Sequence, residues 1–201
     1  METFDTIAGR RSVKKFDPDH VMTEDEITRL METVILTPTS FNIQNWRFVL
    51  VTDQEVKNRI RQKGYDQAQF SDCSVLVVIC GDRNAYDQDP DRYWAAAPAE
   101  VRSAIVPMIR GAYGSSESLR RDENFRSGGL AGQTMMLAVR EMGYDSCPMI
   151  GFDFEAVAEI IKLPADHDII MAVTIGKALE SARGRAGQLP LEDVVFRDSF
   201  R

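Results

Sequence analysis

Two unbroken apolar runs constrain the fold of this chain more than any other feature. They are Val75-Leu76-Val77-Val78-Ile79-Cys80 and Ile169-Ile170-Met171-Ala172-Val173-Thr174-Ile175. Neither run alternates apolar with polar residues, as a strand with one solvent-exposed face does. The sequence therefore predicts a central sheet covered by helices on both faces, which places the chain in the α/β or α+β class.

Two long helices are expected beside these strands. Thr23-Glu24-Asp25-Glu26 fits a capping box, and apolar residues recur with helical spacing over residues 27–35. A second helix is expected over residues 124–142, and it has hardly any polar face. A helix that is apolar on all sides is buried, so this one belongs at the centre of the domain or in an interface.

Shorter elements complete the expected order. Residues 46–51 and 146–150 are predicted strands, residues 2–9, 53–62 and 153–161 are predicted helices, and Pro98 is expected to open a helix that Pro107 bends. Between residues 82 and 116, Tyr93, Trp94 and Tyr113 either line a pocket or pack locally.

The chain has the size and composition of a single globular domain over residues 1–201. Of its 201 residues, 44% are hydrophobic and 27% charged, and no repeat or linker divides it. No apolar run approaches the roughly 20 residues that span a bilayer, and the N-terminus has no signal-peptide layout. We therefore expect a cytoplasmic protein without membrane contacts, in which residues of about 178–201 form a tail that packs over another surface.

Charge and residue counts argue against several classes of function. The net charge of −7 does not suit nucleic-acid binding, which requires a broad basic face. Cys73, Cys80 and Cys147 form no C-x-x-C pair, and His20 and His167 both lie among turn residues. Neither a metal site nor a Ser-His-Asp triad is therefore expected.

One basic stretch stands out in this acidic chain. Arg10-Arg11-Ser12-Val13-Lys14-Lys15-Phe16 places four cations and a hydroxyl within six residues. A guanidinium can bind a phosphate through two hydrogen bonds, and a hydroxyl can add another. A short basic cluster is more often a solvated face, so the stretch indicates a site for an anionic cofactor only if other segments support it.

A loop crowded with hydroxyls and amides follows the first long helix. It reads Thr37-Pro38-Thr39-Ser40-Phe41-Asn42-Ile43-Gln44-Asn45. Such groups often cap helices and close turns. The alternative is a pocket edge that offers neutral donors and acceptors to a heterocycle.

Four segments together resemble the nitroreductase family of FMN-dependent oxidoreductases, and most closely its small bacterial NAD(P)H nitroreductases. The resemblance covers nearly the whole chain and rests on the order and spacing of its pieces. They are the basic stretch, Pro38-Thr39-Ser40-Phe41-Asn42-Ile43-Gln44-Asn45-Trp46-Arg47-Phe48, Gly143-Tyr144-Asp145-Ser146-Cys147-Pro148-Met149-Ile150-Gly151-Phe152, and Ile175-Gly176-Lys177 followed by Arg183 and Arg185. The resemblance implies an α+β, three-layer α/β/α fold with a central mixed sheet, and an intertwined homodimer in which the tail packs on the partner.

The resemblance also implies which residues hold FMN at the subunit interface. Its phosphate would contact Arg10, Ser12, Arg183 and Arg185, with Arg11 ranked lower, and Lys14 would lie near the pyrimidine edge of the ring. The loop of the other subunit would supply Pro38, Thr39, Ser40, Asn42 and Gln44. Gln69 would make a polar flavin contact, and the backbone of Met149, Ile150 and Gly151 would approach the ring.

One position departs from the pattern of the family. Some relatives carry a glutamate before the glycine of the Gly-Phe-Asp turn, where this chain has Ile150. Any role for a carboxylate is lost there, which affects the range of substrates more than flavin binding.

The implied activity is two-electron hydride transfer from NADH or NADPH, through FMN, to nitroaromatics, quinones or similar small electrophilic acceptors in a ping-pong cycle. No side chain is expected to be catalytic, because the chemistry lies at the flavin N5, with Lys14 tuning the flavin. The lack of a G-x-G-x-x-G motif agrees with a nicotinamide that binds only briefly. Alternatives are reductive dehalogenation or enone reduction on the same fold, a protein that stores or senses FMN, and a nicotinamide-only dehydrogenase.

Overall fold

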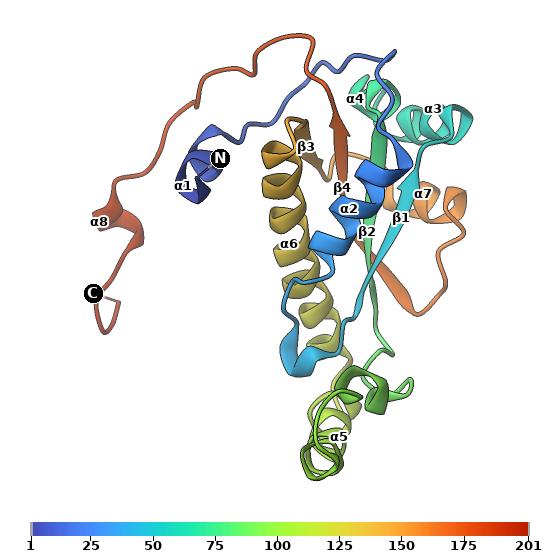
Figure 1. Cartoon of the computed structure of the whole chain (residues 1–201), viewed down its shortest axis with the longest axis vertical. Coiled ribbons are helices and arrows are strands. Elements are labelled where there is room, and N and C mark those ends of the chain that lie inside the picture. The colour runs from blue at the N-terminus through green and yellow to red at the C-terminus, as the bar shows by residue number, and fades with distance from the viewer. Residues whose placement is uncertain (1, 201) are drawn as a thin grey trace.

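The computed structural model describes residues 2–200 and has a four-stranded sheet between two layers of helices (Figure 1). Met1 and Arg201, the ends of the expected domain, lie outside the described residues. The elements in chain order are α1 (Thr3–Gly9), α2 (Glu24–Val34), η1 (Ser40–Asn42), β1 (Trp46–Val51), α3 (Gln54–Lys63), α4 (Gln69–Asp72), β2 (Val75–Asp82), η2 (Pro90–Trp94), α5 (Ala99–Gly114), α6 (Glu117–Glu141), β3 (Asp145–Met149), α7 (Phe154–Ile160), β4 (His167–Gly176) and α8 (Leu191–Val194).

The sheet has the strand order β1-β2-β4-β3, and each neighbouring pair is antiparallel. Val51 at the end of β1 lies opposite Leu76 near the start of β2, so the intervening helices return the chain to the same end of the sheet. The expected mixed sheet is therefore antiparallel in its four strands. A parallel contact is present as an isolated bridge between Ser12 and Ser146.

Both faces of the sheet are covered, as the two apolar runs predict. Along β2, Val75, Val77 and Ile79 pack in one hydrophobic cluster with α2 and α6. The intervening Leu76 and Val78 pack in a second cluster with residues of α3 and α7. These β2 residues are at most 1% exposed. Successive side chains of the strand point to opposite faces of the sheet, and each face is covered by a layer of helices.

Several helix starts follow the predicted capping chemistry. The capping box of α2 is formed, with the Thr23 hydroxyl accepting from the backbone of Glu26 and the Glu26 carboxylate accepting from the backbone of Thr23. Asp53 and Asp153 cap α3 and α7 through one bond each, accepting from the backbone of Val56 at 2.9 Å and of Ala156 at 3.0 Å. Local side chains therefore fix these boundaries.

The long helix α6 begins seven residues before its predicted start. The Ser116 hydroxyl caps it by accepting from the backbone N–H of Leu119, and the first turns, Glu117-Ser118-Leu119-Arg120-Arg121-Asp122-Glu123, are mostly polar. Because these turns are polar, they lack the apolar stripe that indicates a helix in the sequence. The helix is also not buried on all sides within one chain, because Leu130 is 51% exposed.

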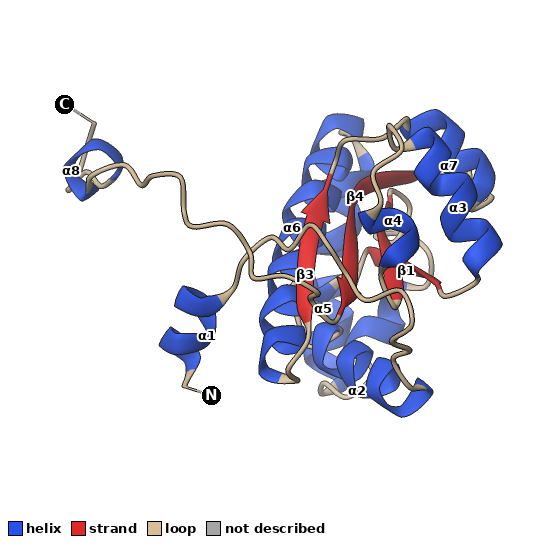
Figure 2. Ribbon diagram, turned by 90° about the horizontal axis from the view of Figure 1, so that it is seen from above, coloured by secondary structure: helices blue, strands red, loops and turns tan. Residues whose placement is uncertain are grey.

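The C-terminal tail stands away from the body of the molecule, whereas α1 lies against α6. Figure 2 shows α1 and the tail that carries α8 on the same side of the sheet edge formed by β3. Every residue from 183 to 200 is exposed. Among the described residues, the helices are too short or too polar to cross a membrane.

Two glycines give a test of the close contact between α6 and β4. A Cβ on Gly128 would lie 2.3 Å from Cδ1 of the buried Ile170, whereas a Cβ on Gly111 of α5 meets nothing within 4 Å among the described residues. Gly128→Ala should lower the free energy of unfolding by about 1–3 kcal/mol. Gly111→Ala, the control, should raise it by up to about 1 kcal/mol. Urea unfolding of both variants measures this, and a Gly128→Ala protein as stable as the wild type contradicts the packing.

Candidate functional site

Backbone pairing holds the basic stretch against the sheet. Val13 N donates to Ser146 O of β3 at 3.1 Å, and Leu179 N, beyond β4, donates to Lys15 O at 3.1 Å. The side chains of Val13 and Phe16 are 2% and 1% exposed, so both belong to the core. Lys14 and Lys15, which lie between these anchors, are exposed.

The tail brings its own cations back to the same place. The Arg11 guanidinium donates to the carbonyl of Arg183, and Nη2 of Arg185 donates to Ala8 O at 3.1 Å. The two segments enclose a cavity of about 460 Å³. It is lined by Arg10, Arg11, Ser12, Lys14, Arg183, Gly184, Arg185, Ala186 and Gly187. Both cationic clusters that the sequence singled out thus meet at one site.

Arg10 gives this cavity its chemical character. Its Nη1 is buried and finds no hydrogen-bond partner within residues 2–200. Arg10 as a whole is half-buried, but a buried N–H without an acceptor is costly, so this guanidinium favours an acceptor such as an anion beside it. Phosphate fits this need, because arginine forms strong paired hydrogen bonds with phosphate oxygens and Ser12 adds a hydroxyl.

Lys14 extends the charged surface towards the end of β3. Its Nζ lies 3.3 Å from Sγ of the buried Cys147 and donates a hydrogen bond to it. Beyond Cys147, Met149 is buried, whereas Ile150 is 69% exposed. The chain therefore presents a cation and an apolar side chain near the same strand end.

The glutamine predicted to contact flavin is buried. Gln69 begins α4 and is 8% exposed. Gln67, two residues earlier, instead donates from Nε2 to Gly151 O at 2.8 Å. Gln67 thus ties the loop before α4 to the Met149-Ile150-Gly151 segment, a contact that the sequence did not reveal because the two segments are 84 residues apart. The flavin contact of Gln69 stays a prediction.

The hydroxyl-rich loop lies at the opposite end of the molecule from the basic stretch. Figure 1 shows it below α2, near α5, whereas the basic stretch passes over the upper ends of α6 and β3. Within the loop, Gln44 N donates to the Thr39 hydroxyl at 2.9 Å, and the Gln44 side chain donates to Asn42 at 3.4 Å. Pro38, Thr39, Ser40, Asn42 and Gln44 therefore lie together, but one chain does not bring them to the cavity.

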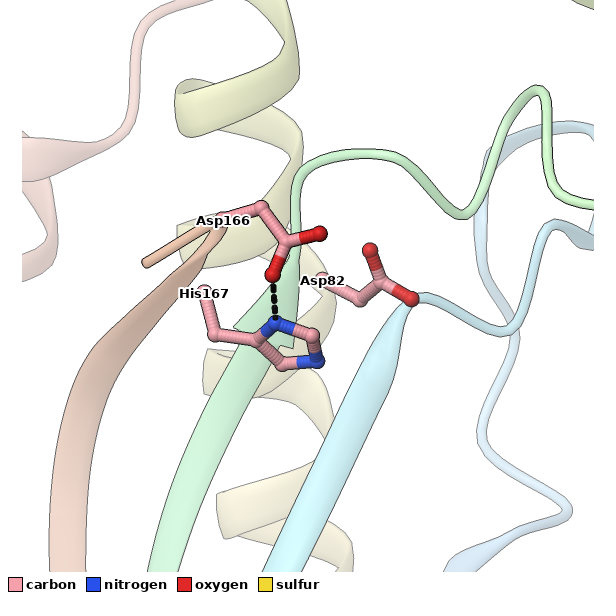
Figure 3. Close-up of side chains that lie close together, drawn as sticks. All are labelled: Asp82, Asp166 and His167. Atoms are coloured by element: carbon pink, nitrogen blue, oxygen red, sulfur yellow. Dashed lines mark hydrogen bonds and ion pairs between the residues drawn. The ribbon is translucent and has the colours of Figure 1, made fainter. Parts of the chain in front are cut away.

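A second polar cluster lies where β2 ends and β4 begins. Figure 3 shows Asp166 and His167 beside Asp82, and their possible metal-binding atoms lie within 4.8 Å of one another. Asp82 already accepts from Arg47 at 2.7 Å and from Asn84 N at 2.8 Å. The hydrogen bond between Asp166 and His167, 2.7 Å long, lowers the pKa of Asp166. Nδ2 of Asn84 also donates to Asp166 at 3.0 Å, so a hydrogen-bond network joins the end of β2 to the start of β4.

Comparisons with known proteins agree with this fold. The sequence model of the Nitroreductase family matches residues 7–177. Protein DrgA of Synechocystis is 51% identical over 196 residues, which cover 95% of this chain and 93% of DrgA. MhqN of Bacillus subtilis, a candidate NAD(P)H nitroreductase, is 33% identical over 193 residues, which cover 92% of this chain and 94% of MhqN.

Solved structures of related proteins have the same fold. A candidate nitroreductase from Exiguobacterium sibiricum, solved in complex with FMN, matches with a TM-score of 0.91 at 29% identity, over 98% of this chain and 97% of that one. A candidate nitroreductase of Bacillus subtilis, ydfN, matches with a TM-score of 0.91 at 31% identity, over 96% and 97% of the two chains. The chain belongs to the nitroreductase family.

Proposed function

We propose that this protein is an FMN-dependent oxidoreductase that takes hydride from NADH or NADPH and reduces nitroaromatics, quinones or similar electrophilic acceptors. The observation that carries the proposal is the cationic cavity lined by Arg10, whose Nη1 is buried and unpaired within the described chain. Family membership, and the FMN in a solved relative, suggest which anion this cavity accepts.

The residues around the cavity fit the phosphate of FMN. Arg10, Arg183 and Arg185 supply positive charge, and Ser12 supplies a hydroxyl. Arg11 has another task, because its bond to the Arg183 carbonyl holds the tail in place. FMN supplies the redox chemistry when it is bound, and the protein binds and orients it.

Lys14 contributes charge rather than proton transfer. Its hydrogen bond to Cys147 fixes the direction of a flexible side chain. A fixed cation at a partly dry site stabilises negative charge that develops nearby, and the energy grows as water is excluded. Ile150 adds exposed apolar surface without charge, which suits uncharged aromatic acceptors.

We propose that the working unit is a homodimer. The loop of residues 38–44 lies away from the cavity of its own chain, as Figure 1 shows. The tail exposes Leu189, Leu191 and Phe200, which are 64%, 74% and 84% exposed. A groove of about 320 Å³, bordered by α1, α2 and α6, is also open to solvent. A second copy would cover these surfaces and bring its loop to the cavity, which would complete the site.

Anaerobic addition of NADH or NADPH to the purified protein tests the activity. The flavin absorbance near 450 nm should bleach and should return when a nitroaromatic or a quinone is added, because both half-reactions use the same cofactor. A bound flavin that neither nucleotide bleaches would favour a storage or sensing protein. A colourless protein that releases no FMN on heating would contradict the proposal altogether.

Retention of FMN tests the phosphate site. Arg10→Ala and Arg183→Ala should each weaken FMN binding about tenfold or more, because a hydrogen bond to a charged group is worth about 1.5–3 kcal/mol. Lys15→Ala is the control, since Lys15 pairs with Glu180 at 2.7 Å and both side chains are 63% exposed. An ion pair exposed in this way contributes little to the stability of the fold. FMN released on dilution, followed by fluorescence, measures the dissociation constant; wild-type affinity in both arginine variants would refute the assignment.

A further inference from the structure

The hydroxyl-rich loop has a backbone conformation that its own residues do not favour. Phe41, Asn42 and Gln44 have φ angles of 52°, 53° and 44°, in the left-handed region. Glycine adopts this region readily, but residues with a side chain do so only when their surroundings hold them there. A bond within the loop, from Gln44 N to the Thr39 hydroxyl, holds part of this shape, and contacts from outside the loop add to it.

Two hydrogen bonds from η2 supply such contacts. Trp94 donates from Nε1 to the carbonyl of Phe41 at 3.0 Å, and Asn42 donates from Nδ2 to the carbonyl of Tyr93 at 2.8 Å. The bonds connect two neighbouring residues of the left-handed segment, Phe41 and Asn42, to two neighbouring residues of η2, Tyr93 and Trp94. They join segments more than 50 residues apart in the sequence.

The element that makes these bonds is itself anchored. Tyr93 donates its hydroxyl to Ala85 O at 3.1 Å, just beyond β2. Phe41 packs edge-on against the buried Tyr113 of α5, with ring centroids 6.2 Å apart. On the other side, the buried Glu123 of α6 accepts from Ser40 N at 3.4 Å. The loop is therefore held between η2, α5 and α6.

We propose that Trp94 is a positioning residue that keeps residues 38–44 in the shape that binds flavin. This inference rests on the proposed function, in which that loop completes the FMN site. Packing of the Trp94 ring alone would also fill space, but it would not fix the Phe41 carbonyl. The indole N–H is therefore the group whose removal should loosen the loop.

The two tryptophans of the chain provide a matched pair of variants. Trp94→Phe removes a hydrogen-bonded N–H and keeps most of the ring. Trp46→Phe makes the same chemical change in the core, where Nε1 is buried without a partner in the part of the chain that the structure describes. FMN release on dilution of the holoprotein and the melting temperature should be measured for both variants.

The expected results separate positioning from general stability. Trp94→Phe should weaken FMN binding about two- to tenfold, the fold-change that one ordinary hydrogen bond gives. Trp46→Phe should lower the melting temperature at least as much as Trp94→Phe does, because it removes buried apolar volume. Its FMN affinity should differ from that of the wild type by less than twofold. Equal FMN affinity in Trp94→Phe and wild type overturns the inference, and so does an equal loss in both variants. Wild-type protein that binds no FMN would instead overturn the proposed function.

A spectroscopic measurement covers the case in which Trp94→Phe does not fold. Indole ¹⁵N labelling gives one N–H resonance for each tryptophan, and the Trp46→Phe protein identifies that of Trp94. This resonance should exchange slowly with solvent and shift when FMN is added. Rapid exchange, or a resonance that FMN leaves unchanged, would overturn the inference.

Discussion

Backbone pairing between the N-terminal segment and the chain that leaves β4 is the constraint on which the site depends. Asp17 N donates to Lys177 O at 2.8 Å and Leu179 N donates to Lys15 O at 3.1 Å, so the two segments run side by side. Val13 and Phe16 anchor this arrangement in the core. The cations between and beside these anchors therefore share one surface, although the acidic protein as a whole repels anions. A local concentration of positive charge is thus built from pairing and burial rather than from net charge.

Lys15 pairs with Glu180, but part of the charge so gathered has no counter-ion within the described chain. Nη1 of Arg10 is buried with no partner among residues 2–200, and such a group costs stability unless an anion or another molecule pairs with it. The exposed tail and the exposed Leu130 on α6 are further surfaces that the described chain leaves open to solvent. Sites that need a ligand commonly store this kind of unfavourable feature, and the rest of the fold compensates for it. Here the compensation comes from a sheet whose central strands are buried on both faces.

The sequence predicts the elements whose causes are local. The apolar runs predict β2 and β4, and the Thr23 capping box predicts the start of α2. The cavity itself is anticipated because both of its cationic segments are visible as motifs. Features that depend on distant partners are not visible: the contact of Gln67 with Gly151, the bond from Trp94 to Phe41, and the Asp82 network. The early start of α6 was missed for a different reason, because its first turns are polar and leave no stripe.

Subunit complementation tests most directly the central claim that the phosphate cavity of one chain is completed by the loop of another. Two defective proteins, Arg10→Ala and Asn42→Ala, are co-expressed with different tags, and the mixed dimer is isolated. If the cavity and the loop come from different chains, one site of the mixed dimer carries both changes and the other carries neither. We predict one FMN per mixed dimer, bound with wild-type affinity. A mixed dimer in which both sites bind FMN as weakly as the parent variants would contradict the account.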